Sequence, residues 1–313
     1  MKSLLSQWEE MCVERLKLLL NSGFYFSKNK DLDGKLRGGA SLNGGDRMSC
    51  VEYFYNVIDR IPRRKARVVE ECQGIVVPSE LQTGYEMLKS ELKKGDDLLP
   101  RMSRQSKDLD YHDGMLDDWG VCHFHLGVRG DLKHNGLIEG TGKIAYVYFA
   151  PYEDVAYVVD VADHGKWGDV DVLERLLASF PEALAAWEMK GFTAISFNAQ
   201  GLDRVSLRKA FVNSATEVKG RVYCSPWGGV MSNGVRMRAA MEILHSRRFL
   251  DQIDGLLPEK LKGLGIPEEQ VDNLILKGFS YGRNWYVLLE NPQDGSLIHL
   301  TERCVGLVKS SKV

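Results

Sequence analysis

The spacing of hydrophobic and polar residues indicates helices at the start of the chain. Residues 1–20 place apolar side chains three and four positions apart, and Glu9, Glu10 and Glu14 interrupt them. This pattern is typical of an amphipathic helix and unlike the uninterrupted apolar core of a signal peptide. The helical spacing returns near residue 51, after a glycine-rich stretch that predicts a long loop. We therefore expect an N-terminal helical and glycine-rich segment over residues 1–66.

The middle of the chain alternates between the strand period and the helical period. Runs rich in β-branched and aromatic side chains predict strands near residues 67–77, 121–128, 143–150 and 155–162. Helical spacing predicts helices over residues 79–94, 108–118 and 170–178. The last two strands are separated by a short break and read as a β-hairpin. We expect an α+β domain over residues 67–180, with a mostly antiparallel central sheet.

The last part of the chain predicts a further α+β region over residues 181–313. Its expected elements are a strand over 193–197, a helix over 202–211, a hairpin over 217–224, a long helix over 235–253 and a hairpin over 285–301. Turn-forming residues around Asn291 and Gly295 favour the last hairpin.

Composition limits the classes of protein to consider. The 313 residues carry a net charge of −2, which gives no overall attraction to nucleic acid. The six cysteines include no CxxC pair, a usage that suits a reducing compartment better than a disulfide scaffold. No apolar run reaches the length of a membrane span. We expect a cytoplasmic protein with no membrane partner.

Three of the seven histidines lie in two short segments. His123 and His125 are two positions apart in a predicted strand, so their side chains share one face. His164 comes just after the predicted hairpin. If the hairpin pairs with that strand, the three imidazoles gather near one edge of a small sheet. Imidazole is well suited to proton transfer near neutral pH, and the pattern therefore predicts a histidine-based active site.

The order of elements around these histidines resembles the RelE superfamily of bacterial toxins, and within it the histidine-dependent YafQ branch. The matching residues are Cys122-His123 in a central strand, the strand from Ile144 to Tyr148, and His164 with Trp167 three positions later. The resemblance covers about a third of the chain. It implies a RelE-like core over residues 67–180 and the activity of an endoribonuclease, acting as a toxin or an antiviral defence effector.

The chemistry that this resemblance implies is RNA cleavage without a metal or other cofactor. One group removes the proton of a ribose 2′-hydroxyl, and another protonates the departing 5′-oxygen. His123, His125 and His164 are the candidate catalytic residues. Trp119 or Trp167 is the candidate stacking surface for a nucleobase. Arg208 and Lys219, from the basic C-terminal region, are candidate phosphate-binding residues.

The same residues admit other interpretations. A His-x-His pair on a strand is also a common ligand pair for zinc or another divalent metal, with His164 or Asp163 as further ligands. Alternatively the imidazoles are structural, and the chain is a non-catalytic binding or sensing module in a bacterial defence or mobile-element system, with a protein partner or inhibitor. The sequence leaves these alternatives, the trigger and the oligomeric state open.

Overall fold

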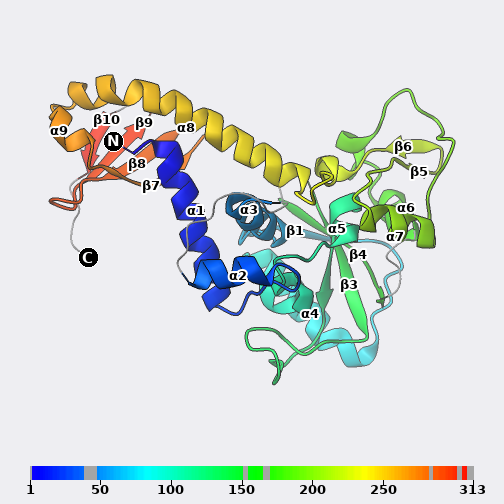
Figure 1. Cartoon of the computed structure of the whole chain (residues 1–313). Helices are drawn as coiled ribbons and strands as arrows, with labels where there is room; N and C mark the ends of the chain where they lie inside the picture. Colours follow the sequence, from blue (N-terminus) through cyan, green and yellow to red (C-terminus); the bar gives the residue numbers. More distant parts are fainter. Residues whose placement is uncertain are drawn as a thin grey trace. The chain divides into compact units, whose positions relative to one another are not determined.

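The computed structural model of the chain describes residues 2–38, 48–150, 154–164, 170–281, 285–301 and 305–308. The chain divides into two compact units, residues 20–239 and residues 1–19 with 240–313 (Figure 1). The boundaries fall inside helix α1 (Leu4–Asn21) and helix α8 (Met237–Gly263). The domain boundaries expected near residues 66 and 180 stay predictions.

The larger unit is built around a four-stranded sheet with the strand order β1-β4-β3-β2. The strands are β1 (Val68–Glu71), β2 (Val121–His125), β3 (Lys143–Phe149) and β4 (Val155–Asp163). β2, β3 and β4 are antiparallel neighbours, and β1 lies parallel to β4. The α+β class and the mostly antiparallel central sheet are therefore confirmed.

The two faces of this sheet pack against different helices. On one face, Leu88 and Leu92 of α4 (Gln82–Lys94) join a buried cluster with Cys122 and Phe124 of β2. On the other face, α6 (Asp171–Ser179) joins a cluster that contains Val121 of β2. Side chains alternate between faces along a strand, so even positions of β2 face α4 and odd positions face the other side. His123 and His125 share the face of Val121.

The remaining elements of the larger unit are short. Its other helices and strands are α2 (Lys30–Arg37), α3 (Cys50–Arg60), α5 (Gly114–Trp119), α7 (Gly201–Lys209), β5 (Thr216–Val218) and β6 (Arg221–Tyr223). Its 3-10 turns are η1 (Ser79–Leu81), η2 (Leu99–Arg101), η3 (Arg104–Lys107), η4 (Ala185–Trp187) and η5 (Pro226–Gly228).

One predicted strand of this unit is wrong. Residues 193–197 form no strand, and most of their side chains are exposed. The backbone N–H of Ile195 donates to the side chain of Glu217 (3.2 Å) in place of a neighbouring strand. Residues with strand propensity form a strand only when another strand offers its backbone groups, and here that partner is missing among the described residues.

The smaller unit combines helices with a second antiparallel sheet, in the order β10-β9-β8-β7. Besides most of α1 and α8 it contains α9 (Glu268–Val271), β7 (Ile275–Ser280), β8 (Tyr286–Glu290), β9 (Leu297–Thr301) and β10 (Val305–Val308). β8 and β9 confirm the predicted C-terminal hairpin, whereas β7 and β10 were not predicted. Among the described residues, no helix has the length and apolar character needed to cross a membrane.

Candidate active site

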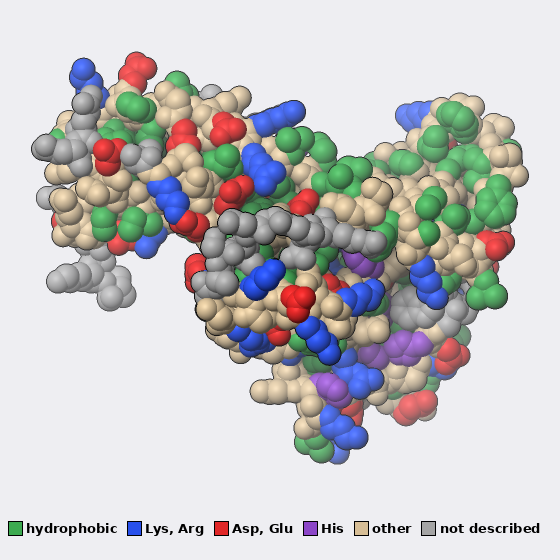
Figure 2. Space-filling model, viewed as in Figure 1, with side chains coloured by type: hydrophobic (Ala, Val, Ile, Leu, Met, Phe, Trp, Pro, Cys, Tyr) green, Lys and Arg blue, Asp and Glu red, His purple; other side chains and the backbone are tan. Residues whose placement is uncertain are grey.

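The three histidines singled out in the sequence lie together in the structure. The ring centroid of His164 is 6.3 Å from that of His123 and 5.1 Å from that of His125. Figure 2 shows histidine side chains at the surface of the larger unit, close to lysine and arginine side chains. The predicted clustering of the three imidazoles is therefore confirmed. Trp167, the expected stacking partner beyond His164, lies outside the described residues.

A β-bulge in β4 explains how His164 reaches this face of the sheet. Tyr146 pairs with Asp160 and Val147 pairs with Val158, so Val159 is an extra residue in β4. Before the bulge, even-numbered side chains such as Val158 join the cluster on the α4 face. After it, even-numbered Ala162 belongs to the opposite cluster. The bulge thus shifts the alternation by one residue, and His164 follows Ala162 onto the face of His123 and His125.

The backbone of Thr141 orients two of the three rings. Its N–H donates to Nδ1 of His125 (3.0 Å), and Nε2 of His164 donates to its carbonyl oxygen (3.1 Å). A neutral His125 that accepts at Nδ1 carries its proton on Nε2. The Thr141 hydroxyl in turn accepts from the N–H of Leu126 (3.1 Å) and donates to the carbonyl of Lys143 (2.6 Å). Because Thr141 acts on the histidines through its backbone, no sequence pattern identified it.

His125 is neutral near pH 7 in this environment. Burial lowers the pKa of His125 to about 4, and repulsion from His164 and His123 adds to this effect, against the hydrogen bond from Thr141. A neutral imidazole can accept or donate a hydrogen bond but carries no extra proton to give up as a general acid. Its neighbours make His125 a neutral hydrogen-bond donor through Nε2.

A buried carboxylate faces the third ring. Oδ2 of Asp113 lies 3.3 Å from Nδ1 of His123, and the two residues are only 4% and 5% exposed. Although burial alone would raise it, the charge of His123 and hydrogen bonds hold the pKa of Asp113 below its usual value. An ionised carboxylate in this position fixes the orientation of the His123 ring. Asp113 is the N-cap of α5, but the helix predicted over residues 108–118 placed it inside the helix, so its capping role was not predicted.

Arg101 supports the end of β2 that carries His125. It is 1% exposed, and its Nη1 donates to the carbonyls of His125 and Gly127, both at 3.2 Å. Nη2 of Arg101 pairs with Glu91 of α4 (2.7 Å), which balances the buried charge. These contacts fix the backbone on which the His125 ring is held.

Trp119 and Arg208 occupy positions that differ from the expected ones. Trp119 is 1% exposed, and its Nε1 donates to the hydroxyl of Thr216 (3.1 Å), so it lies in the core and not on a stacking surface. Nε of Arg208 donates to Asp118 (2.9 Å), and its guanidinium carbon lies 4.4 Å from the centre of the Trp119 ring. The side chain of Arg208 is only 7% exposed and is paired with Asp118, and its role as a phosphate-binding residue stays a prediction.

Lys219 and Asp163 are both at the surface, and their roles as phosphate-binding residue and metal ligand stay predictions. Lys219 is exposed at the tight turn between β5 and β6, with a φ of 48°. The side chain of Asp163 is 78% exposed and forms an ion pair with Lys143 (3.3 Å). Within the described ranges, no group of three or more histidine, cysteine or acidic residues is arranged to hold a metal ion. The zinc interpretation stays a hypothesis.

Comparisons with models of known protein families, with curated proteins and with solved structures found no match to this chain.

Proposed function

We propose that the protein is an endoribonuclease that cleaves RNA by histidine acid–base chemistry, as a toxin or defence effector of the RelE type. The observation that carries this proposal is the cluster of three imidazoles. The ring centroids of His123 and His125 both lie within 6.3 Å of that of His164, and a buried carboxylate faces His123. Attack of a 2′-hydroxyl on phosphorus requires two neighbouring groups, a neutral one that accepts a proton and a protonated one that donates a proton.

The hydrogen bonds give each ring a distinct role. Nε2 of His164 is committed to the Thr141 carbonyl, so His164 acts as the base through Nδ1 and removes the 2′-hydroxyl proton. The 2′-oxygen then bonds to phosphorus while the bond from phosphorus to the 5′-oxygen breaks. His123, whose ring faces the Asp113 carboxylate, donates a proton to the departing 5′-oxygen. The products are a 2′,3′-cyclic phosphate and a 5′-hydroxyl, and both histidines have exchanged one proton.

His125 has a separate role because it is neutral. Its Nε2–H is positioned to donate a hydrogen bond to a phosphoryl oxygen, which carries more negative charge in the transition state. Hydrogen bonds of this kind contribute most when the donor is already oriented, and the Thr141 backbone provides that orientation.

The test is cleavage of a labelled single-stranded RNA in the presence of EDTA. We expect a product with a 2′,3′-cyclic phosphate, and a loss of about 100-fold or more in rate for His123→Ala/His164→Ala. His245→Ala, a histidine of α8 outside the cluster, is the matched control and should cleave like the wild type. The same pair of variants is compared for growth arrest after expression.

Three results would contradict the proposal in different ways. Activity that is lost in EDTA and restored by a divalent ion would indicate the metal-dependent alternative. Cleavage of DNA at a comparable rate would exclude the 2′-hydroxyl mechanism, because DNA has no such group. Absence of cleavage, with full biological effect of the double variant, would indicate a binding or sensing module.

A further inference from the structure

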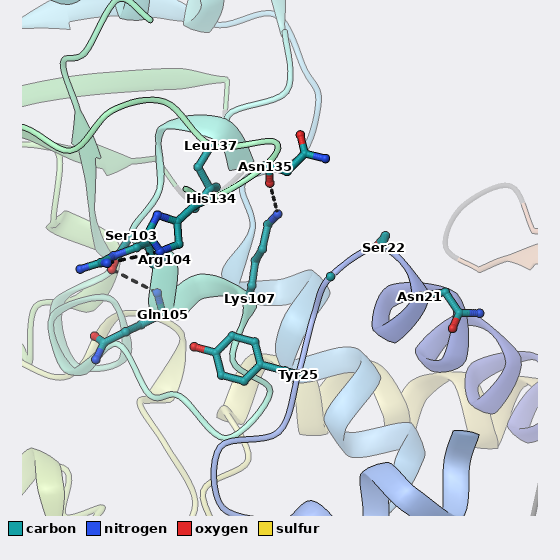
Figure 3. Close-up of a pocket in the computed structure, with 11 residues that line it drawn as sticks. Asn21, Ser22, Tyr25, Ser103, Arg104, Gln105, Lys107, His134, Asn135 and Leu137 are labelled. Carbon is teal, nitrogen blue, oxygen red and sulfur yellow. Dashed lines mark hydrogen bonds between the residues drawn. The ribbon is translucent and has the colours of Figure 1, made fainter. Parts of the chain in front are cut away.

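A polar pocket of about 840 Å³ opens on the larger unit, outside the histidine cluster (Figure 3). Three segments that are distant in sequence line it: residues 21–25, the turn η3, and the loop that follows β2. Its volume is within the range of about 300–1,000 Å³ that is typical of sites for small ligands. None of these segments contains a site residue that was predicted from the sequence.

The charged side chains around this pocket are basic. Arg104, Lys107 and His134 line it, and none of the described residues in its wall is acidic. Lys107 is fixed by a hydrogen bond to the carbonyl of Asn135 (2.8 Å), and Nη1 of Arg104 lies 3.4 Å from Nε2 of His134. Two fixed cations in a wall without carboxylates attract an anion such as a phosphate.

An exposed aromatic ring borders the same pocket. Tyr25 is 42% exposed, and Figure 3 shows its ring below Lys107 and beside the side chain of Gln105. Its backbone is held on both sides, because its N–H donates to the carbonyl of Lys107 (3.0 Å) and its carbonyl accepts from Leu109 (2.8 Å). An aromatic ring on a fixed backbone next to cations is the arrangement on which single-stranded nucleic acids stack their bases.

The pocket is connected to the histidine cluster by one loop. Residues 126–142 contribute His134 and Asn135 to the pocket wall, and the same loop contains Thr141, which orients His125 and His164. Arg104 is also one of the positive groups that, after burial and the two other histidines, lower the pKa of His125. The shared loop and the effect of the Arg104 charge on His125 place the pocket and the histidine cluster in the same region of the larger unit.

We propose that the pocket binds a nucleotide of single-stranded RNA that flanks the cleaved phosphate, with the base stacked on Tyr25 and the backbone phosphates held by Arg104 and Lys107. This inference rests on the proposed function, since it names the part of the same substrate that lies beyond the reacting bond. It explains why Arg104, Lys107 and the exposed ring of Tyr25 lie together in a chain whose net charge is −2.

Binding is measured with a 2′-O-methyl RNA oligonucleotide, which the proposed chemistry cannot cleave. We expect Tyr25→Leu to weaken binding by about 5- to 100-fold, the range for loss of one stacked base, and Tyr25→Trp to retain it. Arg104→Ala/Lys107→Ala should reduce the slope of log affinity against log salt by about 1.4, or about 0.7 for each of two phosphates. Lys133→Ala removes one exposed charge from the same loop outside the pocket and should change affinity less than about twofold.

The results separate this inference from the proposed function. Pocket variants that bind like the wild type, or a Lys133→Ala variant that weakens binding as much as the others, would overturn the inference. RNA cleavage that needs His123 and His164 but proceeds at the wild-type rate in the pocket variants would overturn it alone. Binding that depends on the pocket, without cleavage of unmodified RNA by the wild type, would instead refute the nuclease mechanism. Circular dichroism melting curves for each variant exclude loss of folding.

Discussion

Asp113 performs two tasks through its two carboxylate oxygens. Oδ1 accepts from the N–H groups of Met115 (3.2 Å) and Leu116 (3.1 Å) and so caps α5. Oδ2 faces Nδ1 of His123. Because asparagine caps a helix about as well as aspartate, a single substitution can keep the first task and remove the second.

We predict that Asp113→Asn folds normally but cleaves RNA roughly 100- to 10,000-fold more slowly. Without the carboxylate, the His123 ring is no longer held in the orientation that proton donation needs, so the rate should fall at every pH. The measurement is kcat/KM against pH, with a urea unfolding curve to confirm stability within about 1 kcal/mol. A profile identical to that of the wild type would remove His123 from the role of general acid.

The sequence predicted part of this site, for reasons that differ from residue to residue. His123 and His125 followed from the period of two along a strand. The position of His164 depends on the extra residue Val159, which no alternation pattern showed. The expected stacking role of Trp119 is wrong because its ring is buried against a partner that is 97 residues away, Thr216.

At the scale of elements, α4 approaches the loop after β2 so closely that only glycine fits at the contact. A Cβ built on Gly84 would overlap the backbone carbonyl oxygen of Leu126, next to the histidine strand. By contrast, Gly34 in α2 has no atom within 4 Å of such a Cβ and is exposed. A side chain at position 84 would therefore clash with the backbone, whereas one at position 34 would not.

We predict that Gly84→Ala destabilises the protein by about 1–3 kcal/mol, because the helix or the loop must move. The matched substitution Gly34→Ala should leave stability unchanged or raise it by up to about 1 kcal/mol, since alanine favours the helix. Urea unfolding of both variants measures the difference, and RNA cleavage by Gly84→Ala reports the displacement of β2. Equal stabilities of the two variants would show that the contact at Leu126 is loose.

Most elements could be predicted because their burial has a regular period. In α1, the buried residues Leu4, Trp8, Cys12 and Leu16 repeat every four positions, close to one helical turn. The segment 193–197 has strand propensity but no strand partner among the described residues. Whether such a partner exists cannot be predicted from the residues of the segment alone.

At the scale of the larger unit, the six-residue helix α5 links the histidine strand to distant segments through buried charges. Asp117 binds Arg236 (2.7 Å), and Asp118 binds Arg204 (2.8 Å) as well as Arg208 (2.9 Å). All five side chains are at most 7% exposed. Loss of either partner in such a pair leaves a buried charge without its counterion, which typically costs about 3–5 kcal/mol.

The ionisable groups of the larger unit make its stability depend on pH. Burial and nearby positive charges lower the pKa of His112 from 6.5 to about 4, as for His125. Between these values the unfolded chain binds protons that the folded chain does not, so stability falls as the pH decreases from about 6.5 to 4. Burial raises the pKa of Asp117 to about 6, which has the opposite effect between about 4 and 6. Because two histidines destabilise the folded protein at acid pH and one aspartate stabilises it, we expect the free energy of unfolding to decrease on acidification.

We therefore predict that the midpoint of urea unfolding decreases from pH 7 to pH 5, and that it decreases less in His112→Gln/His125→Gln. The measurement is a series of unfolding curves at both pH values for the wild type and the double variant. The same decrease in both proteins would mean that other groups determine the acid sensitivity.

The bulge at Val159 has a consequence for how this site is gained or lost in evolution. A deletion of one residue in the bulged stretch would leave His123, His125 and His164 in the sequence and yet turn His164 toward the α4 face. A relative that keeps all three histidines can thus lack the cluster. A one-residue deletion in β4 would be enough to disrupt it, without any substitution of a histidine. Searches for related proteins should therefore compare the number of residues in β4, and not only the presence of the three histidines.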